Sequence, residues 1–290
     1  MTTTIAWLDG QWGTAHGLQL PLSDRGLQLS DGLFETVLVL DGQPKLLNDH
    51  LNRWQDGAVL LGMDPPPTAA WLEPLIEQAI QRLGLTEGQG ALRLNWSRGD
   101  SSGRGIDTTG AETHRFWLTL QACKPVYGAI RTIVSRLEQR NAESQLSRCK
   151  TLAYGQAIQA RREAKQAGAE DALLRNNHGQ LCCGTTANLL VQRGGEWLTP
   201  PIQSGCLPGV MRAKALARGF CREAWLGTNL NSGDHALLIN SLGCRTIQSV
   251  DGIPLQQGED PRASGNSIWR QPVSYTHLRA HETGRNLVFR

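Results

Sequence analysis

The sequence lacks the marks of several classes of protein. It contains no run of 18 apolar residues, so no segment predicts a membrane-spanning helix. Lysine and arginine are not gathered in blocks, and a net charge of +3 over 290 residues is small, so we expect no nucleic-acid partner. The first nine residues do not combine a basic stretch with an apolar run, and we therefore expect no secretory signal peptide.

The cysteines form no CxxC pair. There are seven of them, an odd number, and they are scattered along the chain. This pattern argues against a disulfide framework and against a metal site, and it favours a reducing, cytoplasmic location.

What is present is an ordinary globular composition, with 40% hydrophobic and 19% charged residues. A chain of 290 residues is long enough for two compact domains. We expect an N-terminal domain over residues 1–121 and a larger C-terminal domain over residues 122–272. Helical and strand-like patterns occur in both, so the predicted fold class is α/β (α+β).

The N-terminal half contains two hairpin signals and two helical patterns. Apolar segments precede the dipeptides Asp9-Gly10 and Asp41-Gly42, which is typical of tight β-turns. Apolar residues then recur at helical spacing over residues 48–62. A second helix is predicted over residues 71–83, with Thr68 as N-cap and Gly84 just after its end.

The C-terminal half alternates short apolar segments with helical patterns. Strands are predicted over residues 130–135, 171–175, 187–191, 235–239 and 246–250. Helices are predicted over residues 150–167 and 209–218. We interpret the polar stretch 136–148 as a linker that crosses between the domains.

The last residues, 273–290, have no apolar periodicity. The segment is similar to a translated cloning adapter, and we exclude it from the fold as a non-native tail. The alternative is a metal-binding pair formed by His277 and His281, which are four residues apart, but no third ligand is evident.

Lys150 lies in the segment RCKTLAYGQ. A lysine at the start of an amphipathic helix is usually a solvated surface residue, and Lys150 taken alone has that interpretation. It is preceded by SDRGLQLSDGLFET and by LLNDHLNR, which places Arg53 three residues after His50. It is followed by LCCGTTANLLV, GCLPGVMR and INSLG.

In this order and spacing, the segments resemble class IV aminotransferases, the fold-type IV family of pyridoxal-phosphate enzymes. The resemblance extends from about Asp9 to Asp251. It implies a two-domain enzyme with its active site in the cleft between the domains. It also implies a homodimer, because in this family a loop of the neighbouring subunit completes the cleft.

The resemblance further implies a cofactor site for pyridoxal phosphate. Lys150 would bind the cofactor through its amine, and the cofactor phosphate would need a cation and backbone donors at a helix start. Arg53 is the implied cation, and Val210 and Met211 are the implied backbone donors. Asn240 and Ser241 would lie beside the same phosphate.

One position departs from the family. The family carries a glutamate five residues before the asparagine that corresponds to Asn188, where it pairs with the pyridine nitrogen. Cys183 stands at that position here, and a thiol is a poor substitute for a carboxylate. A weaker electron sink favours an elimination over a transamination, unless another group takes the role.

Within the family, LNWSRGDSSGRGID and INSLG resemble 4-amino-4-deoxychorismate lyases. These enzymes release 4-aminobenzoate, a folate precursor, and pyruvate. Arg98 or Arg104 could pair with a substrate carboxylate, although both could equally be solvated loop residues. Lys150 would take the proton from the carbon that bears nitrogen, and Lys150 or Thr36 would protonate the leaving group.

Two alternatives stay open. The first is a D-amino-acid or branched-chain aminotransferase of the same family. The second belongs to another class, an inactive, cofactor-free relative that acts as a binding protein, which the unusual Cys183 makes conceivable.

Overall fold

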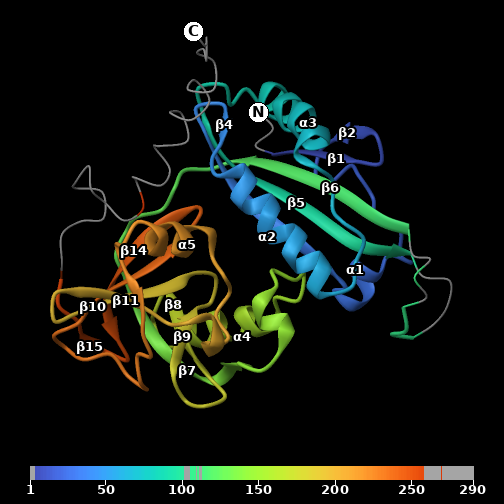
Figure 1. Cartoon of the computed structure of the whole chain (residues 1–290). Coiled ribbons are helices and arrows are strands. Elements are labelled where there is room, and N and C mark those ends of the chain that lie inside the picture. The colour runs from blue at the N-terminus through green and yellow to red at the C-terminus, as the bar shows by residue number, and fades with distance from the viewer. Residues whose placement is uncertain (1–3, 101–104, 109, 111–112, 258–268, 270–290) are drawn as a thin grey trace, which may run out of the picture.

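The computed structural model describes residues 4–100, 105–108, 110, 113–257 and 269 (Figure 1). The tail 273–290, with His277 and His281, lies outside the described residues, as does Arg104. Within the described ranges, no helix combines the length and the apolar composition that crossing a bilayer requires.

The first sheet is antiparallel, with strand order β2-β1-β6-β5-β3-β4. Its strands are β1 (Thr4–Leu8), β2 (Gln11–Gly13), β3 (Gly32–Leu40), β4 (Gln43–Pro44), β5 (Gln89–Asp100) and β6 (Thr113–Ala122). Asp9-Gly10 and Asp41-Gly42 form the two-residue turns, with positive φ at all four residues. Both hairpins that the Asp-Gly dipeptides predict are therefore confirmed.

One face of this sheet is covered by α2 (Leu47–Leu60) and α3 (Ala69–Leu83), and the short α1 (Arg25–Leu29) lies at the C-terminal end of β5 (Figure 1). Alternate residues of the central strands, such as Leu92 and Leu118, pack against Trp54 of α2 and Ile76 of α3. Helix α3 begins after Thr68 and ends at Gly84 in the left-handed conformation, as predicted.

The second sheet is mixed, and its main path runs β12-β11-β10-β13-β14-β7-β8-β9. Its strands are β7 (Ile130–Arg140), β8 (Asp171–Asn176), β9 (Leu181–Gly184), β10 (Asn188–Arg193), β11 (Glu196–Thr199), β12 (Arg222–Glu223), β13 (His235–Asn240), β14 (Gly243–Val250) and β15 (Ile253–Pro254). The helices are α4 (Gly155–Gln166) and α5 (Val210–Ala217), with the 3-10 turns η1 (Gln145–Arg148) and η2 (Ile202–Ser204).

The chain passes from the first sheet to the second between Ala122 and Ile130. The two sheets have separate apolar cores. We propose these sheets as the centres of two domains with the boundaries 1–121 and 122–272.

Two of the predicted elements in the C-terminal half were wrong. Lys150 does not open a helix, because α4 begins only at Gly155. Instead, the segment at Lys150 runs beside β3: the N–H of Phe34 donates to the carbonyl of Lys150 at 2.9 Å, and Thr151 bridges to Leu33. Pairing with a strand of the other sheet overrides the local helical pattern.

The predicted linker is also partly strand. β7 continues to Arg140, well past the expected end at residue 135. After a register shift, Gln139 and Arg140 pair with the end of β8, which supports an extended conformation in a polar segment. β9 was missed as well, because LCCG is short and has no β-branched residue.

Trp269, which is distant in sequence, belongs to the apolar core beside α5. Its side chain is buried against Tyr127, and its indole Nε1–H donates to the carbonyl of Asn240 at 2.7 Å. The residue therefore holds the end of β13, close to the pocket described next.

Candidate active site

A pocket of about 400 Å³ lies where the two sheets meet. Its wall contains every residue that the sequence analysis assigned to cofactor binding and catalysis, namely Thr36, Arg53, Lys150, Cys183, Val210, Met211, Asn240 and Ser241. These residues come from β3, α2, the segment before α4, β9, the start of α5 and the turn after β13. The structure thus gathers positions that are spread over more than 200 residues of sequence.

Lys150 is not a solvated surface lysine. Its Nζ lies 4.1 Å from the centre of the Phe34 ring and donates to the Tyr154 hydroxyl at 2.7 Å. Burial lowers the pKa of Lys150; Glu35 opposes this, and Arg53 and Arg93 lower it further, to about 7. At neutral pH about half of the Lys150 amines are then neutral, and the neutral amine is the form that acts as a nucleophile or general base.

Behind the pocket wall, Glu35 forms a buried network. Its side chain is fully buried, and its carboxylate accepts from Arg53 Nε at 2.8 Å and contacts His50 Nδ1 at 2.7 Å. Burial raises the pKa of Glu35, but Arg53 and His50 outweigh this and lower it to about 2. Glu35 is therefore ionised and fixes the Arg53 guanidinium at the pocket.

The network continues into the other sheet. Burial lowers the pKa of His50, although Glu35 opposes this, so the ring is neutral at pH 7. Its Nε2 lies 3.1 Å from the hydroxyl of Ser241 in the turn between β13 and β14. With the Nδ1 proton assigned toward Glu35, the Ser241 hydroxyl donates to Nε2. One chain of hydrogen bonds thus orients both Arg53 and Ser241.

Sequence reasoning missed Glu35. The signal was present, because a lone carboxylate in the apolar strand FETVLVL requires a buried partner. His50 and Arg53, three residues apart on α2, are those partners.

The start of α5 approaches the same wall. Gly209 is its N-cap, and a Cβ added there would lie 1.9 Å from the amide oxygen of Asn188. Asn188 itself donates to the carbonyl of Leu207 at 2.9 Å. A side chain at position 209 would have to displace the Asn188 amide, and glycine avoids this. Val210 and Met211, the first residues of α5, line the pocket, and the N-terminus of a helix favours an anion.

The lining of the pocket is strongly cationic. Arg53, Arg93, Arg140 and Lys150 line it, and no aspartate or glutamate does so among the described residues. Sequence reasoning missed Arg93 on β5. Its guanidinium lies 3.5 Å from the centre of the Phe34 ring, and its Nε donates to Asn95 at 2.7 Å.

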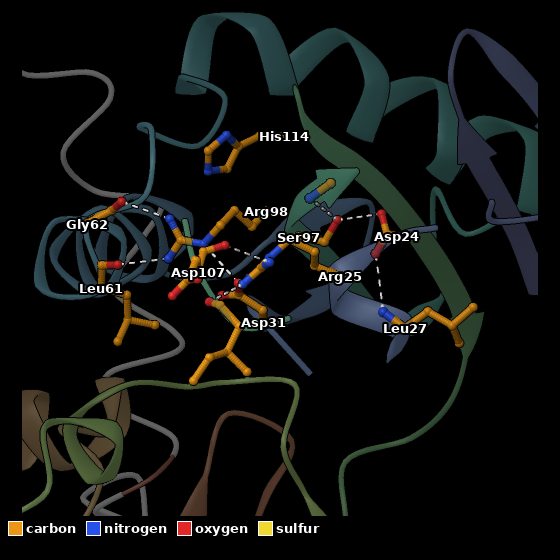
Figure 2. A network of polar contacts seen from close by, with 12 residues as sticks. Asp24, Arg25, Leu27, Asp31, Leu61, Gly62, Ser97, Arg98, Asp107 and His114 are labelled. Carbon is orange, nitrogen blue, oxygen red and sulfur yellow. Dashed lines mark hydrogen bonds and ion pairs between the residues drawn. The ribbon is translucent and has the colours of Figure 1, made fainter. Parts of the chain in front are cut away.

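Arg98, one of the two arginines that the sequence offered for a substrate carboxylate, has a structural role within this chain. It does not line the pocket of its own chain, because its side chain is buried in a structural network (Figure 2). Its Nε donates to Asp31, and its terminal nitrogens donate to the carbonyls of Leu61 and Gly62 at the end of α2, all at 2.9 Å. Arg25 shares the Asp31 carboxylate at 2.9 Å.

The residues present fit a pyridoxal-phosphate cofactor. A lysine amine of low pKa, the partly buried guanidinium of Arg53 and the N-terminus of a helix converge on one pocket. Lys150 would hold the aldehyde carbon, whereas Arg53, Ser241 and the N–H groups of α5 would hold the phosphate. The described lining offers no carboxylate to the ring nitrogen.

Comparisons with known proteins agree with this geometry. The family described as "Amino-transferase class IV" matches residues 32–250. A bifunctional aminodeoxychorismate lyase / D-amino acid transaminase of Mycobacterium tuberculosis is 30% identical over 237 residues, covering 74% of this chain and 79% of the relative.

Two solved structures extend the comparison. The 4-amino-4-deoxychorismate lyase of Pseudomonas aeruginosa has a TM-score of 0.73 at 27% identity, covering 88% of this chain and 94% of that one. A branched-chain aminotransferase of Thermoproteus uzoniensis has a TM-score of 0.79 at 21% identity, over 93% and 92%, which shows the shared fold. The chain therefore belongs to the class IV aminotransferase family and is an enzyme with the fold-type IV architecture of this pyridoxal-phosphate-dependent family.

Proposed function

We propose that the protein binds pyridoxal phosphate at Lys150 and converts 4-amino-4-deoxychorismate to 4-aminobenzoate and pyruvate. The observation that carries the proposal is the charge of the pocket, which has three arginines, a lysine that is charged in about half of the molecules at neutral pH, and no carboxylate among the described lining residues. Such a pocket favours a ligand set with several negative charges. A cofactor phosphate and a substrate with two carboxylates supply them.

The cations divide into two groups. Arg53 is fixed by Glu35 beside the helix start and is suited to the phosphate. Arg93 is positioned by Asn95 and by stacking on Phe34. Among the described residues, only the Nε of the Arg93 guanidinium has a hydrogen-bond acceptor, Asn95. The two terminal nitrogens therefore remain for a planar carboxylate. We propose Arg93 as the substrate-binding arginine of this chain's own pocket.

The cofactor, when bound, would supply an electron sink for the carbon that carries the substrate nitrogen. Lys150, with a pKa of about 7, takes the proton from that ring carbon. The electron pair forms a ring double bond as the ether bond to the enolpyruvyl group breaks. Thr36, which lines the same pocket, or Lys150 protonates the departing enolpyruvate to give pyruvate. The ring becomes aromatic, which makes the step irreversible.

Cys183 supports elimination over transamination. Transamination requires the electron sink to persist until the cofactor carbon is reprotonated, whereas elimination requires it only until the leaving group departs. Without a carboxylate for the ring nitrogen the electron sink is weaker, and this suits elimination, which needs the sink for a shorter time.

An aminotransferase is the second candidate. The relative from Mycobacterium tuberculosis carries a D-amino acid transaminase activity in its name together with the lyase activity. A neutral Lys150 amine could move the proton in either reaction, so both activities have to be assayed on one preparation.

The decisive experiment follows both products of the lyase reaction. Protein loaded with pyridoxal phosphate is incubated with aminodeoxychorismate, and pyruvate and 4-aminobenzoate are measured together. We expect equal amounts of the two, with no keto acid required. Lys150→Ala should abolish this activity, whereas the matched change Lys165→Ala, at an exposed position of α4, should not.

A parallel assay supplies D-alanine or a branched-chain amino acid with 2-oxoglutarate. Amine transfer to the keto acid without formation of 4-aminobenzoate would overturn the lyase proposal. The reaction products thus separate the two candidates directly. A cytoplasmic location and a role in folate precursor synthesis belong to the same proposal.

A further inference from the structure

The Ser241 hydroxyl carries a single proton, and its hydrogen bond to His50 uses that proton. Glu35 is ionised, and a carboxylate only accepts hydrogen bonds, so the proton of the neutral His50 ring lies on Nδ1, 2.7 Å from Glu35. The other ring nitrogen, Nε2, is then an acceptor, 3.1 Å from the Ser241 oxygen. Ser241 therefore donates to a residue behind the pocket wall and presents only lone pairs to the pocket that it lines.

This orientation of Ser241 is unfavourable for a phosphate group in the pocket. The oxygens of a phosphate dianion are strong acceptors and carry no proton. They would face the lone pairs of the Ser241 oxygen with no hydrogen between the two groups. A phosphate beside Ser241 therefore requires the hydroxyl to donate to the phosphate and no longer to His50.

Two rearrangements achieve this without an added proton, and both are unfavourable. If Ser241 simply turned its proton to the phosphate, Nε2 of His50 would lose its hydrogen-bond partner, although the residue is only 1% exposed. If the ring proton moved from Nδ1 to Nε2, the bare Nδ1 would lie 2.7 Å from the ionised Glu35, with two acceptors in contact. A ring with protons on both nitrogens avoids both costs, because it donates to Glu35 and to Ser241 at the same time.

The charges of the network favour the same outcome. Arg53 is already paired with Glu35, because its Nε donates to one carboxylate oxygen at 2.8 Å and its Nη2 to the other at 2.5 Å. Its Nη1 donates to the carbonyl of Pro208 at 3.2 Å. The net charge of this pair is zero, whereas a phosphate monoester brings up to about two negative charges at neutral pH. A proton on His50 adds one positive charge directly behind Ser241.

The groups that surround His50 keep its ring neutral until an anion is added. Burial lowers the pKa of His50, Glu35 raises it, Arg53 and Lys150 lower it, and the net direction is downward. The residue before His50 on α2 is an aspartate whose carboxylate pairs with Lys214 of α5 at 2.6 Å, so these two charges offset each other. An anion beside Ser241 is the change that would raise the pKa of the ring.

We propose that His50 is a positioning residue that takes up one proton when the cofactor phosphate enters the pocket, and that this proton reverses the hydrogen bond to Ser241. The doubly protonated ring donates from Nδ1 to Glu35 and from Nε2 to the Ser241 oxygen. The hydroxyl proton of Ser241 is then directed to the phosphate. The added proton comes from solvent or from a phosphate that enters as a monoanion. The presence of the phosphate rests on the proposed function, and His50, which does not line the pocket, acts through Ser241.

The protonation of the ring is observed by nitrogen NMR of full-length protein labelled in its histidines. The signals of His50 are identified by their loss in His50→Gln. At about pH 7.5 we expect two unequal ring nitrogens in the cofactor-free protein, with the proton on Nδ1, and two protonated nitrogens after loading with pyridoxal phosphate. His235, which is buried and does not line the pocket, should keep its signals. A His50 ring that is charged before loading, or that stays neutral after it, would overturn the proposal.

Matched variants separate the role of Ser241 from the general effect of an added anion. In the loaded wild type, the midpoint at which His50 loses its second ring proton should lie above about pH 7.5. Ser241→Ala removes the acceptor of Nε2–H and should lower this midpoint by at least about one pH unit, a tenfold change in the acid constant. Thr36→Val removes another hydroxyl of the same pocket and should leave the midpoint in place. Equal midpoints in the two variants would refute the action of His50 through Ser241.

Loading is followed separately, by the absorbance of the bound cofactor. A protein that binds pyridoxal phosphate and keeps a neutral His50 ring would refute the role of His50 and leave the proposed function intact. A protein that does not bind pyridoxal phosphate at all would refute the proposed function, and with it the phosphate site that His50 is proposed to serve.

Discussion

Replacing Lys150 by methionine should stabilise the cofactor-free protein while abolishing activity. The amine is held in a cationic pocket, and its pKa is lowered from 10.5 to about 7. At about 1.4 kcal/mol per pKa unit, keeping the charged amine there costs up to about 5 kcal/mol below pH 7. Solvent that enters the mouth of the pocket screens part of this cost, so we expect a gain of roughly 2–4 kcal/mol in the free energy of unfolding.

The pH dependence identifies the cause. Between pH 7 and 10.5 the unfolded chain binds more protons at Lys150 than the folded chain does, so this cost to the wild type decreases as the pH rises. The advantage of Lys150→Met in urea unfolding should therefore shrink by more than half between about pH 6.5 and about pH 9.5. Lys165→Met, at an exposed lysine, is the matched control. An advantage that is equal in both variants, or that is constant with pH, would refute the reasoning.

Three further predictions concern the Glu35 network, the Arg98 network and the assembly. The pKa of Glu35 is lowered to about 2, so its ionisation contributes about 3 kcal/mol to the free energy of unfolding above pH 4.5, and this contribution is lost as the pH falls toward 2. Acid unfolding should therefore be less steep in Glu35→Gln than in the wild type. The control Glu73→Gln, at an exposed position, should behave as the wild type. Arg98→Gln should lower the free energy of unfolding by roughly 1–3 kcal/mol, because it leaves the carbonyls of Leu61 and Gly62 without this donor and leaves Asp31 paired with Arg25 alone. Arg162→Gln, at an exposed position of α4, should change it little. Sedimentation of the loaded enzyme should show twice the mass of one chain; a fully active monomer would contradict the expected homodimer.

Local rules predicted much of the fold. Asp-Gly dipeptides fixed the turns after β1 and β3, and the spacing from Thr68 to Gly84 fixed α3 almost to the residue. These features depend on backbone conformations that few residue types adopt, so they can be read from short windows. The start of α4 could not be predicted from a short window, because the residues before it pair with β3 from the other sheet.

The sequence predicted the pocket residues that belong to recognisable motifs, and it missed those whose role depends on burial in the folded structure. Lys150 and Arg53 belong to motifs and line the pocket as expected. Arg98 and Arg93 are five residues apart on one strand, and nothing in the sequence shows which of them faces the pocket. Arg98 is instead bound to Asp31 and to the end of α2, a consequence of packing between distant segments.

Trp269 determines where this protein can be shortened or cut. It lies beyond β15 (Ile253–Pro254), yet its indole is bonded to the carbonyl of Asn240, whose neighbour Ser241 belongs to the pocket network. Cleavage between residue 257 and Trp269 would turn this contact into one between two separate molecules, which loses the high local concentration that the covalent link provides. An affinity tag with a protease site, or a truncated version for crystallisation, should therefore be placed after Trp269.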